Sequence, residues 1–314
     1  MAVVIRGTGN AVPAQKMPNE ALDEKLETSD EWIRSHTGIG SRYVAAQDET
    51  SSVLGARACQ KALEQAGVSA DAVDLIVCAT ATPDYQGFPA TACLIQAKLG
   101  AVKAAAFDVS AACSGFIYAL ESAAGLLERR GWRYALVCGA ETLTRIVDWS
   151  DRSTCVLFGD GAGAVLVERT ADDSRQKGIG EVILGADGAG GGELFIDEQR
   201  HIRMNGRAVY TFAVRVLSET VERLLEKEGL SIDDVDLVVC HQANSRILAA
   251  AAKRLGIDSA KIVNNMEEYG NTSAASIPIT YADLVAQGRL REGMTIISAG
   301  FGAGLTWGGC VIRW

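Results

Sequence analysis

An internal repeat constrains the fold of this chain more than any other feature of its sequence. The segment GVSADAVDLIVC at 67–78 recurs as GLSIDDVDLVVC at 229–240, an offset of 162 residues. Each copy follows a helix-periodic segment and ends in an apolar, strand-like run. Alternating helices and buried strands are typical of α/β layers with largely parallel central strands. The repeat therefore predicts a duplicated α/β/α/β/α sandwich, with pseudo-twofold halves spanning 1–170 and 171–314.

Composition and charge exclude several classes of protein. Hydrophobic residues make up 48% of the 314 residues, yet no apolar run reaches the roughly 18 residues of a membrane span. The first residues, MAVVIRGTGNAVP, lack the basic region and long apolar core of a signal peptide. A formal charge of −9 argues against bulk nucleic-acid binding. We therefore expect a cytoplasmic protein that binds neither membranes nor nucleic acids.

The eight cysteines show no metal-binding or disulfide pattern. There is no C-x-x-C and no Cys/His cluster, and several cysteines lie in apolar runs, where a free thiol packs as a small hydrophobe. We therefore expect no metal site. Gly7-Thr-Gly9 follows a strand, but Val12-Pro13 replaces the helix start of a dinucleotide-binding fingerprint, so no nucleotide cofactor is expected either.

Cys113 differs from the other cysteines in its local context, AFDVSAACSGFIYAL. An apolar strand at 104–109 leads into small residues, and a helix is predicted to begin near Ser114. The positive end of a helix dipole lowers the pKa of a nearby thiol and raises its thiolate fraction. Cys113 is therefore a candidate nucleophile, with a buried structural cysteine as the alternative.

His241 and Asn271 are the candidate partners of Cys113. His241 follows the strand VDLVVC and matches Ala79 in the repeat, a difference that a shared structural requirement would not produce. Asn271 precedes a helix predicted from about Ala274, where helix capping is the simpler explanation. The repeat maps Ala275 onto Cys113, so we expect the three side chains to converge between the halves. The amides of Cys113 and of Ala303 or Gly304 could form an oxyanion hole.

Six motifs together resemble one family of enzymes. They are TSDEWI (28–33), ACSGF (112–116), DR with FGDGAGA (151–164), HQAN (241–244), YGNTSAAS (269–276) and GFGAGLTWG (300–308). The chain resembles the β-ketoacyl-[acyl-carrier-protein] synthases III, the initiating condensing enzymes of bacterial fatty-acid synthesis. The resemblance implies a thiolase-like sandwich and a homodimer. No cofactor is implied, since the CoA thioester is a substrate.

The resemblance also implies a reaction. An acyl-CoA would acylate Cys113, and malonyl-acyl carrier protein would lose carbon dioxide to give an enolate. His241 and Asn271 would stabilise that enolate while it attacks the Cys113 thioester, giving 3-oxoacyl-acyl carrier protein. Degradative thiolases use a second cysteine near the C-terminal glycine loop, and 300–302 (GFG) offers none.

Further residues acquire expected roles from the same resemblance. Trp32 and Arg152 would sandwich the CoA adenine, although His36 stands where the family often carries arginine. Phe88 would cap the acyl pocket across a dimer interface. Residues 242–257 contain no acidic residue, and the expected docking surface for the acidic carrier protein comprises Gln242, Arg246, Lys253 and Arg254.

Other functions remain open at this point. A papain-like Cys-His-Asn hydrolase would place its nucleophile near the N-terminus, and a silent subunit would lack Cys113. An acyltransferase or condensing enzyme of a specialised, polyketide-like pathway would share most of these residues. The helix C-terminus alone would explain Lys253 and Arg254, and lysine near Thr211 is absent. The sequence leaves the primer undetermined among acetyl, longer straight-chain and branched groups.

Overall fold

The structure, a computed structural model, describes residues 2–22, 26–171 and 177–314 and contains two mixed β-sheets. The strands are β1 (Ala2–Ala11), β2 (Gln15–Pro18), β3 (Ser41–Val44), β4 (Leu75–Ala79), β5 (Ala105–Val109), β6 (Tyr134–Thr142), β7 (Asp160–Thr170), β8 (Gly178–Ala186), β9 (Leu194–Ile196), β10 (Ile202–Met204), β11 (Leu237–Cys240), β12 (Thr295–Gly302) and β13 (Thr306–Arg313). The helices are α1 (Asp30–Thr37), α2 (Ser51–Ala66), α3 (Thr91–Leu99), α4 (Gly115–Arg130), α5 (Arg152–Cys155), α6 (Gly206–Glu228), α7 (Ser245–Leu255), α8 (Met266–Tyr269) and α9 (Ser276–Ala286).

The two sheets repeat one strand order. The first runs β1-β7-β6-β4-β5, and the second runs β8-β13-β12-β11. The pairs β6-β4 and β12-β11 are parallel, and the strand pairs on the β7 and β13 side of them are antiparallel. In the first sheet β5 adds a second parallel pair with β4. A single parallel bridge between Val238 and Ile262 stands where the second sheet would have its fifth strand. The internal repeat in the sequence therefore corresponds to two halves with the same strand order.

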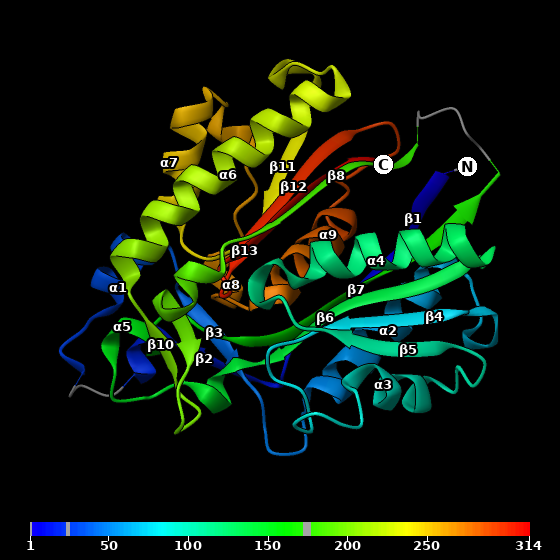
Figure 1. The fold of residues 1–314 in the computed structure, drawn as a ribbon. Helices are drawn as coiled ribbons and strands as arrows, with labels where there is room; N and C mark the ends of the chain where they lie inside the picture. Colours follow the sequence, from blue (N-terminus) through cyan, green and yellow to red (C-terminus); the bar gives the residue numbers. More distant parts are fainter. Residues whose placement is uncertain (1, 23–25, 172–176) are drawn as a thin grey trace.

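Helices separate and cover the sheets in five layers (Figure 1). Helices α4 and α9 lie between the sheets, α2 and α3 cover the outer face of the first, and α6 and α7 cover the second. Helix α9 is apolar on nearly all sides, as expected of a helix buried between two sheets. A Cβ on Gly163 would lie 2.3 Å from Ile279 N, so glycine is needed there for α9 to contact β7. The predicted α/β/α/β/α sandwich is confirmed, while the boundary between 170 and 171 stays a prediction.

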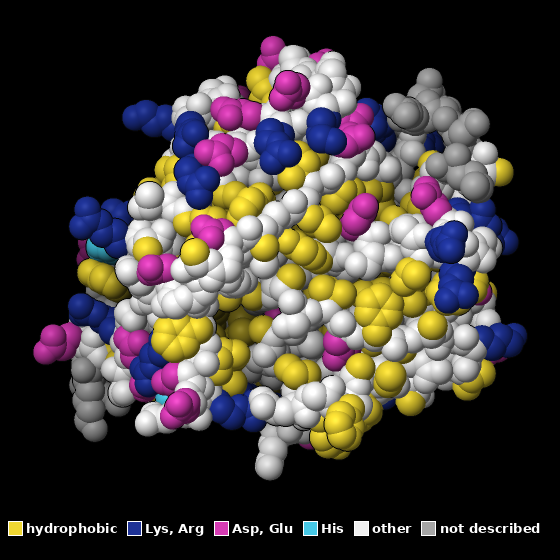
Figure 2. Space-filling model, in the orientation of Figure 1, with side chains coloured by type: hydrophobic (Ala, Val, Ile, Leu, Met, Phe, Trp, Pro, Cys, Tyr) yellow, Lys and Arg dark blue, Asp and Glu magenta, His cyan; other side chains and the backbone are white. Residues whose placement is uncertain are grey.

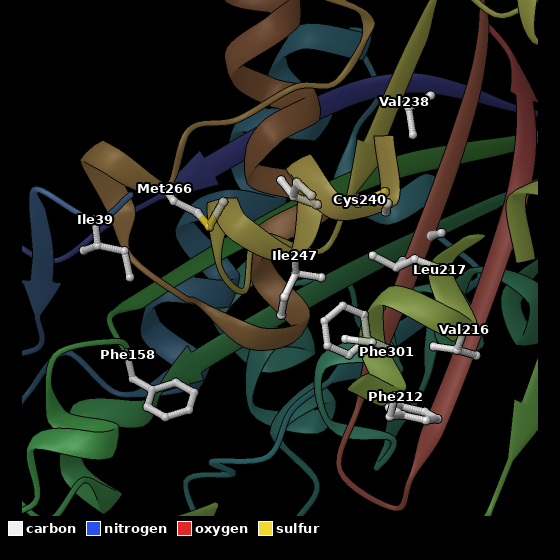
Figure 3. Packing of buried hydrophobic residues seen from close by; sticks show 14 of the residues in the cluster. Ile39, Phe158, Phe212, Val216, Leu217, Val238, Cys240, Ile247, Met266 and Phe301 are labelled. Atoms are coloured by element: carbon white, nitrogen blue, oxygen red, sulfur yellow. The ribbon is translucent and has the colours of Figure 1, made fainter. Parts of the chain in front are cut away.

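The second half packs its core between α6, α7 and strands β11 and β12 (Figure 3). Phe301 on β12 lies edge-on to Phe212 of α6, with ring centroids 6.4 Å apart. Ile247 of α7 and Phe158 of the first half belong to the same buried cluster. This core therefore joins the halves and fixes the ends of β11 and β12, where the candidate site lies.

The repeat offset is not constant. Leu75 and Leu237 begin equivalent strands 162 residues apart, whereas their parallel partners, Ala135 and Ile296, are one residue closer in sequence. The 3₁₀ turns before α4 and α9 span Ala112–Ser114 and Ser273–Ala275, and they begin with residues at φ 42° and 49°. The counterpart of Cys113 is therefore Ala274, not Ala275 as predicted. In the part of the chain that the structure describes, no helix is long and apolar enough to cross a membrane.

Candidate active site

Cys113 lies in the 3₁₀ turn between β5 and α4, with only 8% of its surface exposed. Gly302, at the end of β12, brings the second half against it. A Cβ on Gly302 would lie 2.7 Å from Cys113 N, so only glycine permits this approach. Ala303 and Gly304 follow in the turn beyond β12 and line a cavity together with Cys113. The predicted oxyanion-hole residues are thus close to the thiol, and Gly302 makes the close backbone approach expected of the Gly302-Ala303-Gly304 segment.

The thiol of Cys113 is not acidified in this structure. The pKa of Cys113 is raised to about 12, mainly by burial, while the side chain of Ser273 opposes this rise and the negative charge of Glu141 makes a smaller contribution to it. The predicted lowering of this pKa is wrong, because the loss of hydration at a buried sulfur outweighs the attraction of one helix end. At neutral pH, Cys113 is therefore a thiol that must lose its proton during the reaction.

His241 follows β11 and is 1% exposed. Its Nδ1 lies 2.8 Å from Ser276 Oγ, which also accepts the Gln242 N–H at 3.3 Å. We assign the Ser276 hydrogen to Nδ1, which leaves the proton of the neutral ring on Nε2. Burial lowers the pKa of His241 to about 3, so the ring is neutral at physiological pH. His241 is therefore an uncharged N–H donor.

Asn271 is held by the first half of the chain. Its N–H donates to Leu157 O at 2.9 Å, and its carbonyl accepts from Gly159 N at 3.0 Å. Its side-chain Oδ1 accepts from Ser273 N at 2.9 Å, which leaves the amide NH₂ to donate elsewhere. The loop at 157–159 therefore fixes Asn271, and its NH₂ group has no hydrogen-bond partner among the described residues and can donate to a ligand.

Two cavities meet at Cys113. One, of about 230 Å³, is lined by Cys113, His241 and Asn271 and extends to Trp32 and Arg152. The other, of about 440 Å³, is mainly apolar. The surface is hollowed and lined with hydrophobic side chains near β10 (Figure 2). The three side chains predicted to converge do so around a single cavity.

Trp32 contacts two side chains, Arg152 and His36, in the smaller cavity. The guanidinium of Arg152 lies 5.0 Å from the indole ring, and His36 stacks on it at 4.3 Å with planes 17° apart. His36 Nδ1 lies 2.8 Å from Trp32 O, which fixes the imidazole in place. Trp32 and Arg152 are thus brought together as predicted, and a planar base would have to enter between them.

Comparison with known proteins agrees with this geometry. The sequence model described as 3-Oxoacyl-[acyl-carrier-protein (ACP)] synthase III matches residues 107–188, and its C-terminal counterpart matches 225–314. A β-ketoacyl-[acyl-carrier-protein] synthase III from Geobacillus kaustophilus is 48% identical over 314 residues, which cover 100% of this chain and 99% of the relative. The chain belongs to the β-ketoacyl-[acyl-carrier-protein] synthase III family. It is an acyltransferase of the condensing type.

Solved structures place the chain in the same family. A 3-oxoacyl-[acyl-carrier-protein] synthase III from Aquifex aeolicus superposes with a TM-score of 0.95 at 44% identity, covering 99% of this chain and 100% of that one. The priming β-ketosynthase of the R1128 polyketide pathway gives 0.93 at 36% identity, covering 99% and 96%. The thiolase-like fold is therefore shared by members that serve different pathways.

The larger cavity of this synthase contains residues that sequence reasoning missed. Its apolar lining comes mainly from β9, β10 and the segment after β6: Leu143, Ile146, Phe158, Leu194, Phe195, Ile196 and Ile202. The short apolar runs LTRI (143–146) and LFI (194–196) indicate buried or cavity-lining segments. The sequence does not show that they lie beside Cys113, because these segments are distant from it in the chain. Phe88 lines neither this cavity nor the smaller one and is 88% exposed.

The predicted docking surface of this synthase needs one correction. Gln242 is 1% exposed, and its amide donates to Cys240 O and Val263 O and accepts from Asn265 N. It holds the loop after β11 and is unavailable to a partner. Arg246, Lys253 and Arg254 are exposed on α7, opposite the buried Ile247, Leu248 and Ala251. Lys and Arg side chains gather on the flank where α7 and α1 lie (Figure 2).

Proposed function

We propose that the chain joins an acyl-CoA primer to malonyl-acyl carrier protein with loss of carbon dioxide, as the first condensation of fatty-acid synthesis. The observation that supports this assignment is the grouping of Cys113, His241 and Asn271 around one cavity. That cavity also reaches Trp32 and Arg152, an indole and a guanidinium suited to stacking on adenine. We expect the product to be 3-oxoacyl-acyl carrier protein and the protein to act in the cytoplasm.

The first half-reaction is acyl transfer to Cys113. The sulfur attacks the thioester carbonyl, whose oxygen gains negative charge beside the turn that holds Gly302, Ala303 and Gly304. Backbone N–H groups aimed at that oxygen stabilise the charge better than they stabilise the neutral carbonyl. The acyl chain then extends into the larger apolar cavity, since that cavity opens at the same sulfur.

The second half-reaction is decarboxylation of the malonyl thioester. As carbon dioxide leaves, negative charge moves onto the thioester oxygen. His241 Nε2–H and the Asn271 amide are the donors near Cys113 in the smaller cavity, and one such donor is worth about 3–4 kcal/mol. The enolate carbon then attacks the Cys113 thioester. Nothing in this scheme requires a cofactor besides the CoA thioester, which is a substrate.

A reconstituted reaction tests the assignment. The purified chain, a panel of acyl-CoAs and malonyl-acyl carrier protein should release carbon dioxide and give 3-oxoacyl-carrier protein, both measured directly. Because the larger cavity encloses about 440 Å³, primers longer than acetyl should also be accepted. Acylation of Cys113 without any decarboxylation would instead favour an acyltransferase of a specialised pathway.

We propose that α7 carries the docking surface for the carrier protein, now reduced to Arg246, Lys253 and Arg254. Arg246 lies two residues after Asn244, which lines the smaller cavity and accepts the Arg246 N–H, so Arg246 stands near the entrance. Arg246→Glu should slow condensation with malonyl-acyl carrier protein about tenfold at low salt, since charge at an interface rim acts mainly on encounter rate. The wild-type rate should fall between about 0.05 and 0.5 M salt, and the rate of the variant should respond less.

Two controls isolate this effect. Acylation from a small thioester without a nucleotide bypasses the docking surface, so Arg246→Glu should leave its rate unchanged. Arg289→Glu changes the net charge equally at an exposed position outside α7 and should not affect either reaction. Equal slowing of the small thioester would mean that Arg246 shapes the catalytic site, and the docking assignment would then be abandoned.

We also propose that two copies associate through the edge strand β5. Among the strands that the structure describes, β5 pairs only with β4, so its other edge is available to a second chain. Phe88 is 88% exposed, Val102 is 74% exposed and Tyr85 is 56% exposed, which is unusual for such apolar side chains on a monomer. A partner's copy of Phe88 would then reach the acyl cavity that Phe88 does not reach in its own chain.

A further inference from the structure

Two hydroxyl groups join the halves of the chain beside the nucleophile. Ser114 belongs to the 3₁₀ turn of Cys113 and is fully buried, whereas Thr306 is the first residue of β13. Ser114 Oγ lies 2.9 Å from Thr306 Oγ1, although 192 residues separate them in the chain. A polar side-chain contact therefore connects the turn of the nucleophile directly to the second half.

Each hydroxyl also contacts a backbone carbonyl. Ser114 Oγ donates to Ala111 O at 2.8 Å, and Thr306 Oγ1 lies 2.9 Å from Ala303 O and 3.2 Å from Ala111 O. A hydroxyl carries one proton, so we assign the Thr306 proton to Ala303 O, the nearer carbonyl. The Ser114 proton is then shared between Ala111 O and Thr306 Oγ1. We call this pair, Ser114 and Thr306, the hydroxyl clasp.

The hydroxyl clasp holds the oxyanion-hole turn, residues 302–304. Two of the three residues in this turn are glycines, so it has few side chains with which to anchor itself. Just beyond it, Leu305 and Asp187 exchange backbone hydrogen bonds of 2.9 and 2.8 Å. Within the turn, the Thr306 hydroxyl holds the Ala303 carbonyl. The clasp therefore ties the middle of the oxyanion-hole turn to the turn that carries the nucleophile.

We propose that Ser114 and Thr306 are positioning residues that aim the oxyanion-hole turn at the substrate carbonyl during acyl transfer to Cys113. This inference rests on the proposed acylation. An oxyanion hole is effective because its donors are already oriented before negative charge develops. A peptide group is planar, so holding the Ala303 carbonyl also fixes the direction of the Gly304 N–H, one of the candidate donors.

The place of the hydroxyl clasp predicts which half-reaction it serves. Thr306 lines the larger cavity together with Cys113 and the oxyanion-hole turn. The described residues that line the smaller cavity include His241 and Asn271 but neither residue of the clasp. Loss of the clasp should therefore slow acylation and leave decarboxylation unaffected, whereas a general disturbance of the structure would slow both.

The test is single-turnover acylation by acetyl-CoA, followed by mass spectrometry of the intact protein. Thr306→Val keeps the shape of the side chain and removes the hydroxyl, and it should acylate about 10- to 10²-fold more slowly at saturating acetyl-CoA. The half-saturating concentration should not change, because the nucleotide would bind in the smaller cavity. Carbon dioxide release from the pre-acylated variant should stay within a few fold of wild type. Thr306→Ser restores the hydroxyl and should acylate within a few fold of wild type.

The matched control is Thr170→Val. Thr170 Oγ1 donates to Ala2 O at 3.3 Å, and Thr170 lines neither cavity at Cys113. Both valine variants lose one hydroxyl-to-carbonyl bond, so their thermal midpoints should fall by similar amounts, yet only Thr306→Val should acylate slowly. Ser114→Ala should also slow acylation. Its combination with Thr306→Val should be little slower than Thr306→Val alone, because the two hydroxyls act as one unit.

Three results would overturn the positioning role. They are acylation of Thr306→Val at the wild-type rate, failure of Thr306→Ser to recover that rate, and equal slowing of acylation and carbon dioxide release in Thr306→Val. The last result would make the hydroxyl clasp an ordinary structural contact. Failure of the wild-type chain to acylate would instead count against the proposed function, and with it against the inference that rests on it.

Discussion

Replacing Cys113 by serine should abolish acylation of the chain by acyl-CoA. Serine keeps the shape of the side chain, but its hydroxyl is a far weaker acid and nucleophile than a thiol, so we expect a loss of at least about 10³-fold. Mass spectrometry of the intact protein should show one added acyl group per wild-type chain and none in Cys113→Ser. The variant should remain folded, because the substitution removes no packing volume of consequence.

The matched control is Cys93→Ser. Cys93 is exposed, whereas the other seven cysteines are buried. It is therefore the thiol that a thioester would modify if acylation were non-specific and needed no active site. This control should retain full acylation at Cys113. If the acyl group persisted in Cys113→Ser and moved to another cysteine, both the nucleophile and the site built around it would have to be reassigned.

His241→Ala and Asn271→Ala should each lower decarboxylation of malonyl-acyl carrier protein by about 10²- to 10³-fold. The enolate oxygen loses a hydrogen-bond donor in either variant. Acylation of Cys113 depends instead on the backbone amides of the oxyanion-hole turn at Ala303 and Gly304, which lines the larger cavity. Acylation should therefore stay within a few fold of wild type. Release of carbon dioxide from the pre-acylated enzyme measures the first effect, and mass spectrometry measures the second.

The pH dependence gives a second check on His241. Its pKa is lowered to about 3, so the ring gains a proton only well below neutral pH. His241 should therefore contribute no inflection to decarboxylation between about pH 5 and 8. His201→Ala is the control, because His201 lines neither cavity at Cys113. Equal loss of acylation and decarboxylation in His241→Ala would contradict this division of labour.

The repeat and the motifs were enough to predict the framework. Segments 67–78 and 229–240 each end in an apolar run that must be buried on both faces. Such strands need helices on both sides of their sheet, which predicts an α/β sandwich. The fold class and family are confirmed. The sequence also predicts the meeting of Cys113, His241 and Asn271, because Cys113 and His241 each follow a strand and Asn271 precedes the turn that is equivalent to that of Cys113 in the other half.

Tertiary structure alone decided the electrostatics and the close contacts. The helix end beside Cys113 is a local feature, but its effect on the thiol pKa is overridden by burial beneath β12 and by the charge of Glu141 on β6. The sequence places Gln242 next to a basic helix, but its side chain is buried and hydrogen-bonded to the backbone of the loop after β11. The one-residue change in repeat offset is invisible until strand register is known. Hydration, charge and register depend on neighbours distant in sequence, so composition and spacing do not determine them.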